Sequence, residues 1–273
     1  MKISYNLIVI ALFSFLFLQS CRKDDFQNNQ SLTTTSIDIA TQQTLLESNE
    51  TEINEQIESG LAGITTRSYP IRSWASKPGT YPNTLTIDYG PNGVVGPFGH
   101  IRSGKIIVQM SAPLKVFGAV RVVNHVNFYI DDIKIEGNVV LTNYGVNSQN
   151  QNVFKRDVND RRLIFPNDKI IQWDGNQTLT QIEGSQTQTI IDDVWASTGS
   201  SFGINRADND FEVNTIEPLI YVVGCPWIVE GVLEINSNNS TLSIDYGNGD
   251  CNSLALLTLS DGDKKEINLI RWW

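Results

Sequence analysis

The amino-acid sequence predicts a mainly β protein, and three observations support that prediction. From about Ser68 onward, apolar residues recur at every second position, which is the period of a half-buried strand. Clusters of Asn, Asp, Gly and Pro separate the apolar segments, as turns do. No segment between them has the helical pattern that a parallel β-α-β unit needs. Residues 66–273 should therefore form one antiparallel sheet meander, as a sandwich, an open barrel or a curved sheet.

The segment before the sheet predicts one amphipathic helix over residues 38–60. Leu46, Ile53 and Ile57 are at helical spacing, glutamates lie between them, and a glycine follows as a stop. We expect this helix to pack on the β domain; a helix that binds a partner is the alternative. Residues 21–37 are polar and of low complexity, which is typical of a flexible tether.

The clearest hairpin surrounds Asp131-Asp132. Apolar residues occupy even positions over residues 120–130 and odd positions over 133–141, so each strand has one buried face. The odd-numbered polar residues of the first strand should then lie half-exposed on the other face: Arg121, His125 and Asn127. The same period predicts further strands near residues 84–89, 103–111, 162–166, 169–174, 211–222, 226–236, 240–247, 254–260 and 264–270.

Two distant segments are nearly identical. Thr84-Leu-Thr-Ile-Asp-Tyr-Gly90 recurs as Thr241-Leu-Ser-Ile-Asp-Tyr-Gly247, with six identities in seven. A shorter similarity relates Tyr144-Gly-Val-Asn147 to Phe202-Gly-Ile-Asn205. The first separation exceeds any short repeat period, so these segments indicate related hairpins in one domain rather than a solenoid.

The N-terminus predicts a bacterial lipoprotein. An apolar run from Leu7 to Leu18 follows Lys2 and is too short to span a bilayer. Leu18-Gln-Ser-Cys21 then resembles the lipobox, whose cysteine is diacylated, for example with palmitate, and becomes the first residue after cleavage. We expect residues 1–20 to be a signal peptide and Cys21 to carry the membrane anchor. An ordinary secretory signal is the alternative.

A predicted export signal follows the cysteine. Lys23, Asp24 and Asp25 resemble the short charged export signal that directs lipoproteins of the Bacteroidetes type to the outside of the outer membrane. We therefore expect the extracellular face of the outer membrane as the location, with a solvated linker as the alternative. The formal net charge of −10 argues against nucleic acid as a partner, because phosphates would be repelled.

Two cysteines remain after acylation of Cys21. Cys225 and Cys251 should form a disulfide in an oxidising compartment; two buried free thiols are the alternative. Neither belongs to a Cys-x-x-Cys motif, and His100 and His125 are distant in sequence, so we expect no metal site and no cofactor.

Candidate catalytic residues are few. Asp131-Asp132 and Asp192-Asp193 are paired carboxylates of the type that glycoside hydrolysis uses. Neighbours on a strand point to opposite faces, so we expect both doublets to mark turns or strand ends. Asp208-Asn-Asp210 and Asp261-Gly-Asp263 lack the remaining ligands of a calcium loop and are also interpreted as turns. We expect His125 to be structural and the protein not to be an enzyme.

Aromatic residues give the one hint of a ligand, because flat aromatic faces stack on sugar rings. Trp173 and Trp227 lie in apolar strand patterns and should belong to the core. The full set of tryptophans is Trp74, Trp173, Trp195, Trp227, Trp272 and Trp273.

Several segments together resemble a group of uncharacterised Bacteroidetes surface lipoproteins. They are Ile101-Arg-Ser-Gly-Lys-Ile106, Asn143-Tyr-Gly-Val-Asn147, Phe165-Pro166, Asp192-Asp193, Cys225-Pro-Trp227 and Tyr246-Gly-Asn-Gly-Asp-Cys251. The resemblance covers most of residues 80–270 and implies location and a β-rich fold, but no mechanism. We expect a lipid-anchored, surface-exposed binding or scaffold module that is not an enzyme, with a glycan or a surface protein as its partner. A carbohydrate-binding module is the first alternative, and a glycan-acting hydrolase the second.

Overall fold

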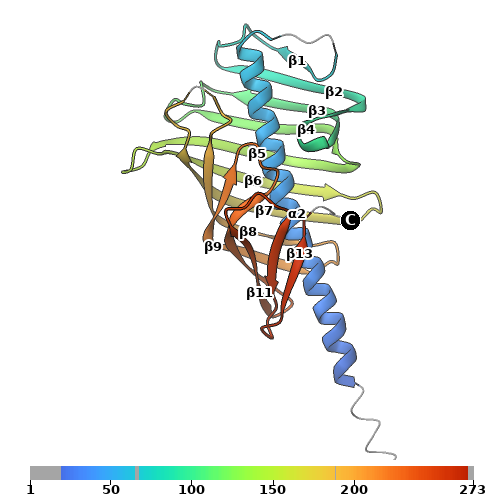
Figure 1. The fold of residues 1–273 in the computed structure, drawn as a ribbon. Coiled ribbons are helices and arrows are strands. Elements are labelled where there is room, and N and C mark those ends of the chain that lie inside the picture. The colour runs from blue at the N-terminus through green and yellow to red at the C-terminus, as the bar shows by residue number, and fades with distance from the viewer. Residues whose placement is uncertain (1–19, 65–67, 188, 270–273) are drawn as a thin grey trace, which may run out of the picture.

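The strands form one open antiparallel sheet in a computed structural model that describes residues 20–64, 68–187 and 189–269 (Figure 1). Each strand pairs with its neighbours in sequence, so β1 and β13 are the two edges of a 13-stranded meander. The strands are β1 (Ile71–Trp74), β2 (Asn83–Val95), β3 (Ile101–Met110), β4 (Val120–Ile130), β5 (Ile133–Val146), β6 (Asn152–Ile164), β7 (Ile170–Glu183), β8 (Val194–Ile204), β9 (Asp210–Val222), β10 (Ile228–Ser237), β11 (Ser240–Asn248), β12 (Leu254–Thr258) and β13 (Lys264–Asn268). A short 3₁₀ helix, η1 (Pro97–Gly99), lies between β2 and β3. The predicted antiparallel meander is confirmed, and the form it takes is a curved sheet.

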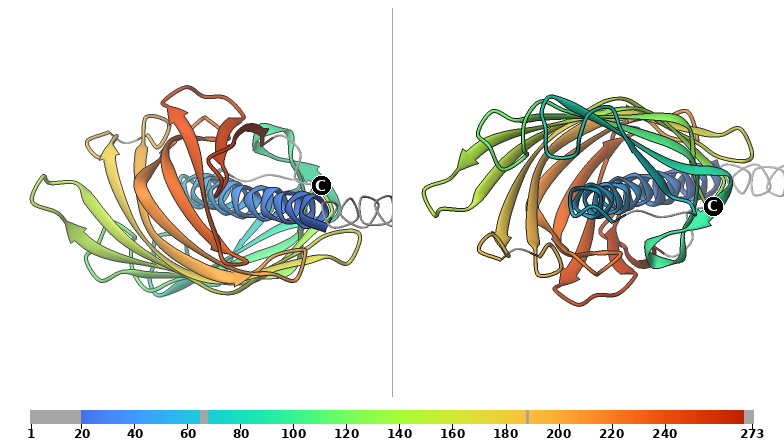
Figure 2. Two further views of the ribbon diagram at one scale, coloured as in Figure 1. Left: turned by 90° about the horizontal axis from the view of Figure 1, so that it is seen from below. Right: turned by 90° about the horizontal axis from the view of Figure 1, so that it is seen from above.

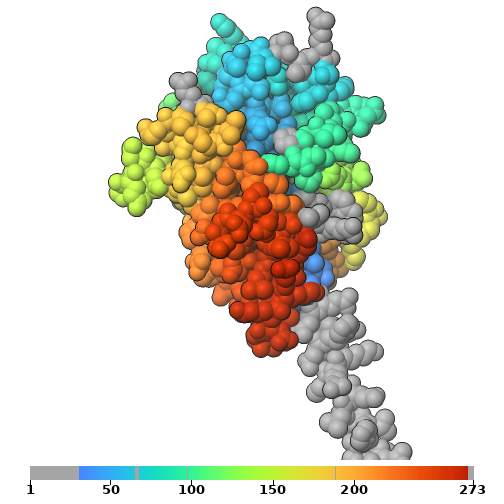
Figure 3. All heavy atoms as spheres, in the orientation of Figure 1, coloured from blue at the N-terminus to red at the C-terminus, as the bar shows by residue number. Residues whose placement is uncertain are grey.

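One long helix, α2 (Ser20–Leu61), runs along the concave side of the sheet. Figure 2 shows the strands curving around the helix in both end-on views, and in Figure 3 the C-terminal strands cover its middle from one side. Every residue from 38 to 46 is buried, so this part of the helix is enclosed on all sides. Its buried residues include the predicted Leu46, Ile53 and Ile57.

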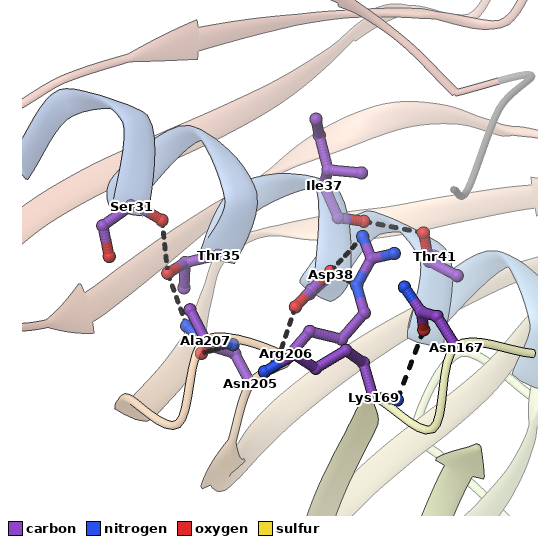
Figure 4. Close-up of polar contacts among 10 residues, drawn as sticks. All are labelled: Ser31, Thr35, Ile37, Asp38, Thr41, Asn167, Lys169, Asn205, Arg206 and Ala207. Carbon is purple, nitrogen blue, oxygen red and sulfur yellow. Dashed lines mark hydrogen bonds and ion pairs between the residues drawn. The ribbon is translucent and has the colours of Figure 1, made fainter. Parts of the chain in front are cut away.

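The helix is longer than the predicted 38–60, and the segment expected to be a flexible tether, residues 21–37, is helical. From Leu32 onward its side chains pack against the sheet. Asn205 Nδ2 donates to Thr35 Oγ1 at 2.7 Å, and Arg206 Nε donates to Asp38 Oδ1 at 2.5 Å (Figure 4). The end of the segment that resembles a spacer, from Leu32 onward, is therefore part of a buried interface, because the sheet supplies hydrogen-bond partners such as the one to Thr35.

The repeated heptapeptides occupy corresponding places in β2 and β11. Their apolar side chains and tyrosines are all buried on the concave side: Leu85, Ile87, Tyr89, Leu242, Ile244 and Tyr246. In both copies the aspartate carboxylate accepts a hydrogen bond from the backbone N–H of the glycine two residues later, at 2.8 Å for Gly90 and 2.9 Å for Gly247. The two segments are the same local structure, as the sequence identity predicts.

The predicted phase of β4 is wrong in its first half. Arg121 is buried at 1% exposure, whereas Val126 is 43% exposed, so the odd positions face the helix. The register shifts between Asn124 and Phe128, where Asn127 has a φ of 45°. This irregularity switches the faces, and Phe128 then points inward as predicted. The turn at Asp131-Asp132 is confirmed, since both residues have positive φ between β4 and β5.

Glycines allow the strands to bend around the helix. Gly104 in β3 and Gly137 in β5 have φ of 82° and 87° and lie at shifts in strand register. A Cβ at Gly104 would be 1.8 Å from the carbonyl oxygen of Asn127, and one at Gly137 would be 2.4 Å from that of Asp160. Only glycine fits such bulges, which increase the local twist and curvature of a sheet.

Candidate functional site

The predicted lipidation and export residues lie at the start of α2. Cys21, Lys23, Asp24 and Asp25 precede Leu32, which is fully buried against the sheet. This part of the helix extends beyond the strands in Figure 1. Residues 1–19 of the predicted signal peptide, residues 1–20, lie outside the described residues, as do Trp272 and Trp273.

The predicted disulfide is confirmed. Cys225 and Cys251 are bonded, with a Cα–Cα distance of 5.9 Å. Cys225 lies between β9 and β10, and Cys251 lies between β11 and β12. The bond therefore ties two successive loops at the same end of the C-terminal strands.

The carboxylate doublets lie in a turn and before a strand, as predicted. Asp131 Oδ1 accepts a hydrogen bond from the backbone N–H of Ile101 at 2.8 Å, and its other oxygen pairs with His100. Asp193 directly precedes β8 and is buried, with Gln181 Nε2 donating to its Oδ1 at 2.8 Å. Burial raises the pKa of Asp193. In the described ranges no three His, Cys, Asp or Glu side chains are arranged to hold a metal ion.

Ion pairs between inward-pointing arginines and α2 lie on the concave side of the sheet. Arg121 pairs with Glu50 of α2, and its Nη1 donates to Asn54 Oδ1 at 2.7 Å. Arg156 on β6 pairs with Glu47 in the same way. Both arginines are at most 1% exposed. The concave side is therefore occupied by the chain's own helix and is not an open cleft.

His125 faces this helix rather than the outer face, which corrects the sequence-based expectation. Its ring lies 3.1 Å from Asn49 Nδ2 and 3.0 Å from Arg161 Nη1. Burial, followed by the charge of Arg161, holds the pKa of His125 well below 6.5. Burial also lowers the pKa of Arg161, to about 9, with a contribution from Arg156. The neutral imidazole can accept from the guanidinium, so the contact of His125 is structural.

A small cavity remains between the helix and the strands. It has a volume of about 100 Å³ and lies between Glu47 and Thr51 of α2 and the apolar side chains of Phe154, Leu179 and Trp195. Ligand sites usually measure about 300–1,000 Å³. This cavity is therefore too small for an ordinary substrate.

The outer face carries a larger and more open groove of about 900 Å³ across β7 to β11. A row of outward side chains from five strands lies in it. Successive members are directly paired across neighbouring strands, and we name them the outer row: Asp174, Phe202, Glu212, Asn236 and Thr241.

The aromatic residue of the outer row was not among the tryptophans that the sequence singled out. Trp173 is in the core as predicted, whereas Trp227 is only partly buried and packs against the core. Trp195 packs on Phe154 at a ring separation of 5.7 Å. Phe202 is instead 61% exposed. The similarity of Phe202-Gly-Ile-Asn205 to Tyr144-Gly-Val-Asn147 is the sequence feature that could have indicated this exposed aromatic residue. Tyr144 is exposed as well. In both segments the asparagine side chain accepts backbone N–H groups in the following turn.

No protein family, curated protein or solved structure matches this chain. Across the residues that the structure describes, no helix has both the length and the apolar character needed to cross a membrane.

Proposed function

We propose that this protein is an outer-membrane lipoprotein, exposed on the cell surface, that binds a ligand through the outer face of its sheet and is not an enzyme. The observation that carries the proposal is the division between the two faces. The concave face is filled by α2 and its ion pairs, whereas the outer face has an open groove with an exposed aromatic side chain. A ligand of ordinary size is therefore best accommodated on the outer face.

The start of α2 supports anchoring through Cys21. The helix leads from this residue into the sheet without interruption. At about 1.5 Å per residue, the helical stretch from Cys21 to Leu32 measures roughly 16 Å. An acyl anchor at Cys21 would thus hold the β domain at a distance from the lipid headgroups.

Several contacts favour binding over catalysis. His125 lies against α2, and the residues Asp131 and Asp193 are engaged in hydrogen bonds at strand ends. None of these three lines the outer groove. The residues that the sequence offered for catalysis therefore do not share the site that is open to a ligand.

Acylation is tested by replacing Cys21 with serine. Cells labelled with a fatty acid should incorporate label into the wild type but not into Cys21→Ser, which should move to the soluble fraction. Cys251→Ser is the matched control, because it removes a cysteine elsewhere and should keep the label. Label in Cys21→Ser would contradict the anchor.

Surface exposure is tested by replacing Lys23, Asp24 and Asp25 with alanine. Protease added to intact cells should cut the wild type and spare this triple variant, while both remain acylated. The control replaces Asp261, Asp263 and Lys264, an exposed group of the same charges in another part of the chain. Equal protection of wild type and triple variant would place the domain on the periplasmic side.

A further inference from the structure

We infer that the outer row is a binding site for a neutral glycan chain. The inference rests on the proposed function, since it names the ligand class of the outer face. It is carried by the pairing of five strands, the exposure of Phe202 and the chemistry of the side chains on either side of it.

The geometry favours a chain over a single small molecule. Asp174, Phe202 and Glu212 are direct cross-strand partners on β7, β8 and β9, and the row continues to Asn236 and Thr241. Neighbouring strands are about 4.8 Å apart, so the four steps of the row span roughly 19 Å. The groove thus presents an elongated set of contacts that runs across the strands.

The side chains match the two kinds of surface on a sugar ring. One face of a pyranose consists of C–H groups, which can pack on the exposed ring of Phe202. Hydroxyl groups project from the edge of the ring and can donate to the carboxylates of Asp174 and Glu212 on either side. Asn236 and Thr241 add an amide and a hydroxyl further along the row. Apolar contact flanked by a few placed polar groups is the usual composition of a ligand site.

The same residues argue against other ligands. Two carboxylates beside Phe202 would repel an anionic glycan, a phosphate or a nucleic acid. A protein partner would favour a broad apolar patch, but Ile204 is the only other exposed large apolar side chain among the described residues that line the groove. A neutral glycan is compatible with both the negative charge of the groove and its small apolar area.

The row is partly fixed before any ligand arrives. Thr241 Oγ1 donates to Asn236 Oδ1 at 2.6 Å, and Asp174 Oδ1 accepts from the backbone N–H of Asp160 at 2.9 Å. The strands that carry these residues are paired on both sides. Binding would therefore cost little conformational entropy in the protein.

The test is the mobility of the purified full-length protein in native gels that contain a soluble polysaccharide. The probes are a β-glucan, an α-glucan, a mannan and a xylan, with the anionic polymer polygalacturonate as comparison. At least one neutral polymer should retard the wild type. Phe202→Ala should weaken that retardation by at least about tenfold in apparent affinity, because it removes the central contact.

Phe117→Ala is the matched control. Phe117 is 75% exposed in the loop before β4, so the variant removes an exposed phenylalanine that is remote from the row. It should bind like the wild type, and Phe202→Trp should retain binding. Because Phe202 is exposed, Phe202→Ala should fold, which thermal unfolding would verify.

The outcomes separate this inference from the proposed function. Absence of retardation by all four neutral polymers, or equal retardation of wild type and Phe202→Ala, would overturn the glycan site. Retardation by polygalacturonate alone would overturn it as well. Shortening of a neutral polymer by the wild type but not by Phe202→Ala would support the site and overturn the non-enzymatic part of the proposed function.

Discussion

Individual buried polar side chains determine how the helix fits the sheet. Arg121 and Arg156 point inward from β4 and β6, where an unpaired charge would cost several kcal/mol. Glu50 and Glu47 of α2 supply the partners. A shift of the helix along the sheet would separate these pairs. The ion pairs therefore favour one position of the helix over others that would bury similar apolar area.

His125 makes the stability of the protein depend on pH. Its pKa is held well below 6.5 in the folded chain, so below this pH the unfolded chain binds more protons than the folded chain. Stability should therefore fall as the pH decreases from about 7 to about 5, by up to about 1.4 kcal/mol per pH unit from this group. In His125→Gln this contribution should disappear.

The measurement is urea unfolding of both proteins over that pH range. Groups that titrate alike in both proteins cancel in the difference between their free energies of unfolding. This difference between wild type and His125→Gln should shrink or reverse as the pH falls toward 5. Parallel stability curves would contradict the buried neutral state of His125.

At the residue scale, the sequence predicted what depends on local chemistry. The turn at Asp131-Asp132 and the Cys225–Cys251 pair were predicted correctly. The orientations of Arg121 and His125 were not, because the irregularity at Asn127 reverses the alternation of β4. Alternation alone cannot locate such an irregularity when the residue that carries it is not glycine.

At the scale of elements, strands with apolar alternation were predictable and strands with polar inward faces were not. The strand β8 was missed because Ser197 and Ser201 occupy its buried positions, and the serine- and glycine-rich segment resembles a loop. Most of β6 was missed because Arg156 points inward. The first part of α2 was missed for the same reason. Within it, Thr35 and Ser36 are buried, and Thr35 accepts a hydrogen bond from Asn205, a partner that only the folded sheet provides.

The glycine bulges should be essential to the strands that contain them. Gly137 and Gly262 have the same φ of 87°, but a Cβ at Gly137 would meet the backbone of β6, whereas at Gly262 nothing lies within 4 Å. Alanine should cost about 1–2 kcal/mol at Gly262 from backbone strain alone. At Gly137 the clash adds to this, and we expect a loss of more than about 4 kcal/mol.

Urea unfolding of Gly137→Ala and Gly262→Ala gives the comparison directly. If Gly137→Ala does not fold, circular dichroism at low temperature records the loss. Equal destabilisation by the two substitutions would show that the close approach of β5 and β6 at this bulge is not required.

At the scale of the whole molecule, the disulfide should contribute substantially to stability. It closes a chain segment with a sequence separation of 26, for which the chain-entropy relation gives about 3.5 kcal/mol. The double variant Cys225→Ala, Cys251→Ala should lose about this amount in urea unfolding. A reductant should lower the wild type to the level of the variant and leave the variant unchanged. An effect of reductant on the variant would assign the loss to another cause.

Because the strands pair in the order of the sequence, the entropy lost on loop closure is distributed unevenly between the sheet and the helix. Each strand meets the next one along the chain, so the contacts within the sheet are local in sequence. The contacts of α2 are different: Asp38 and Arg206 are 168 residues apart. The entropy lost on closing a loop grows with the logarithm of its length, by about 0.6 kcal/mol for each doubling. Contacts between residues far apart in the sequence slow folding, and in this protein they are concentrated in the docking of α2.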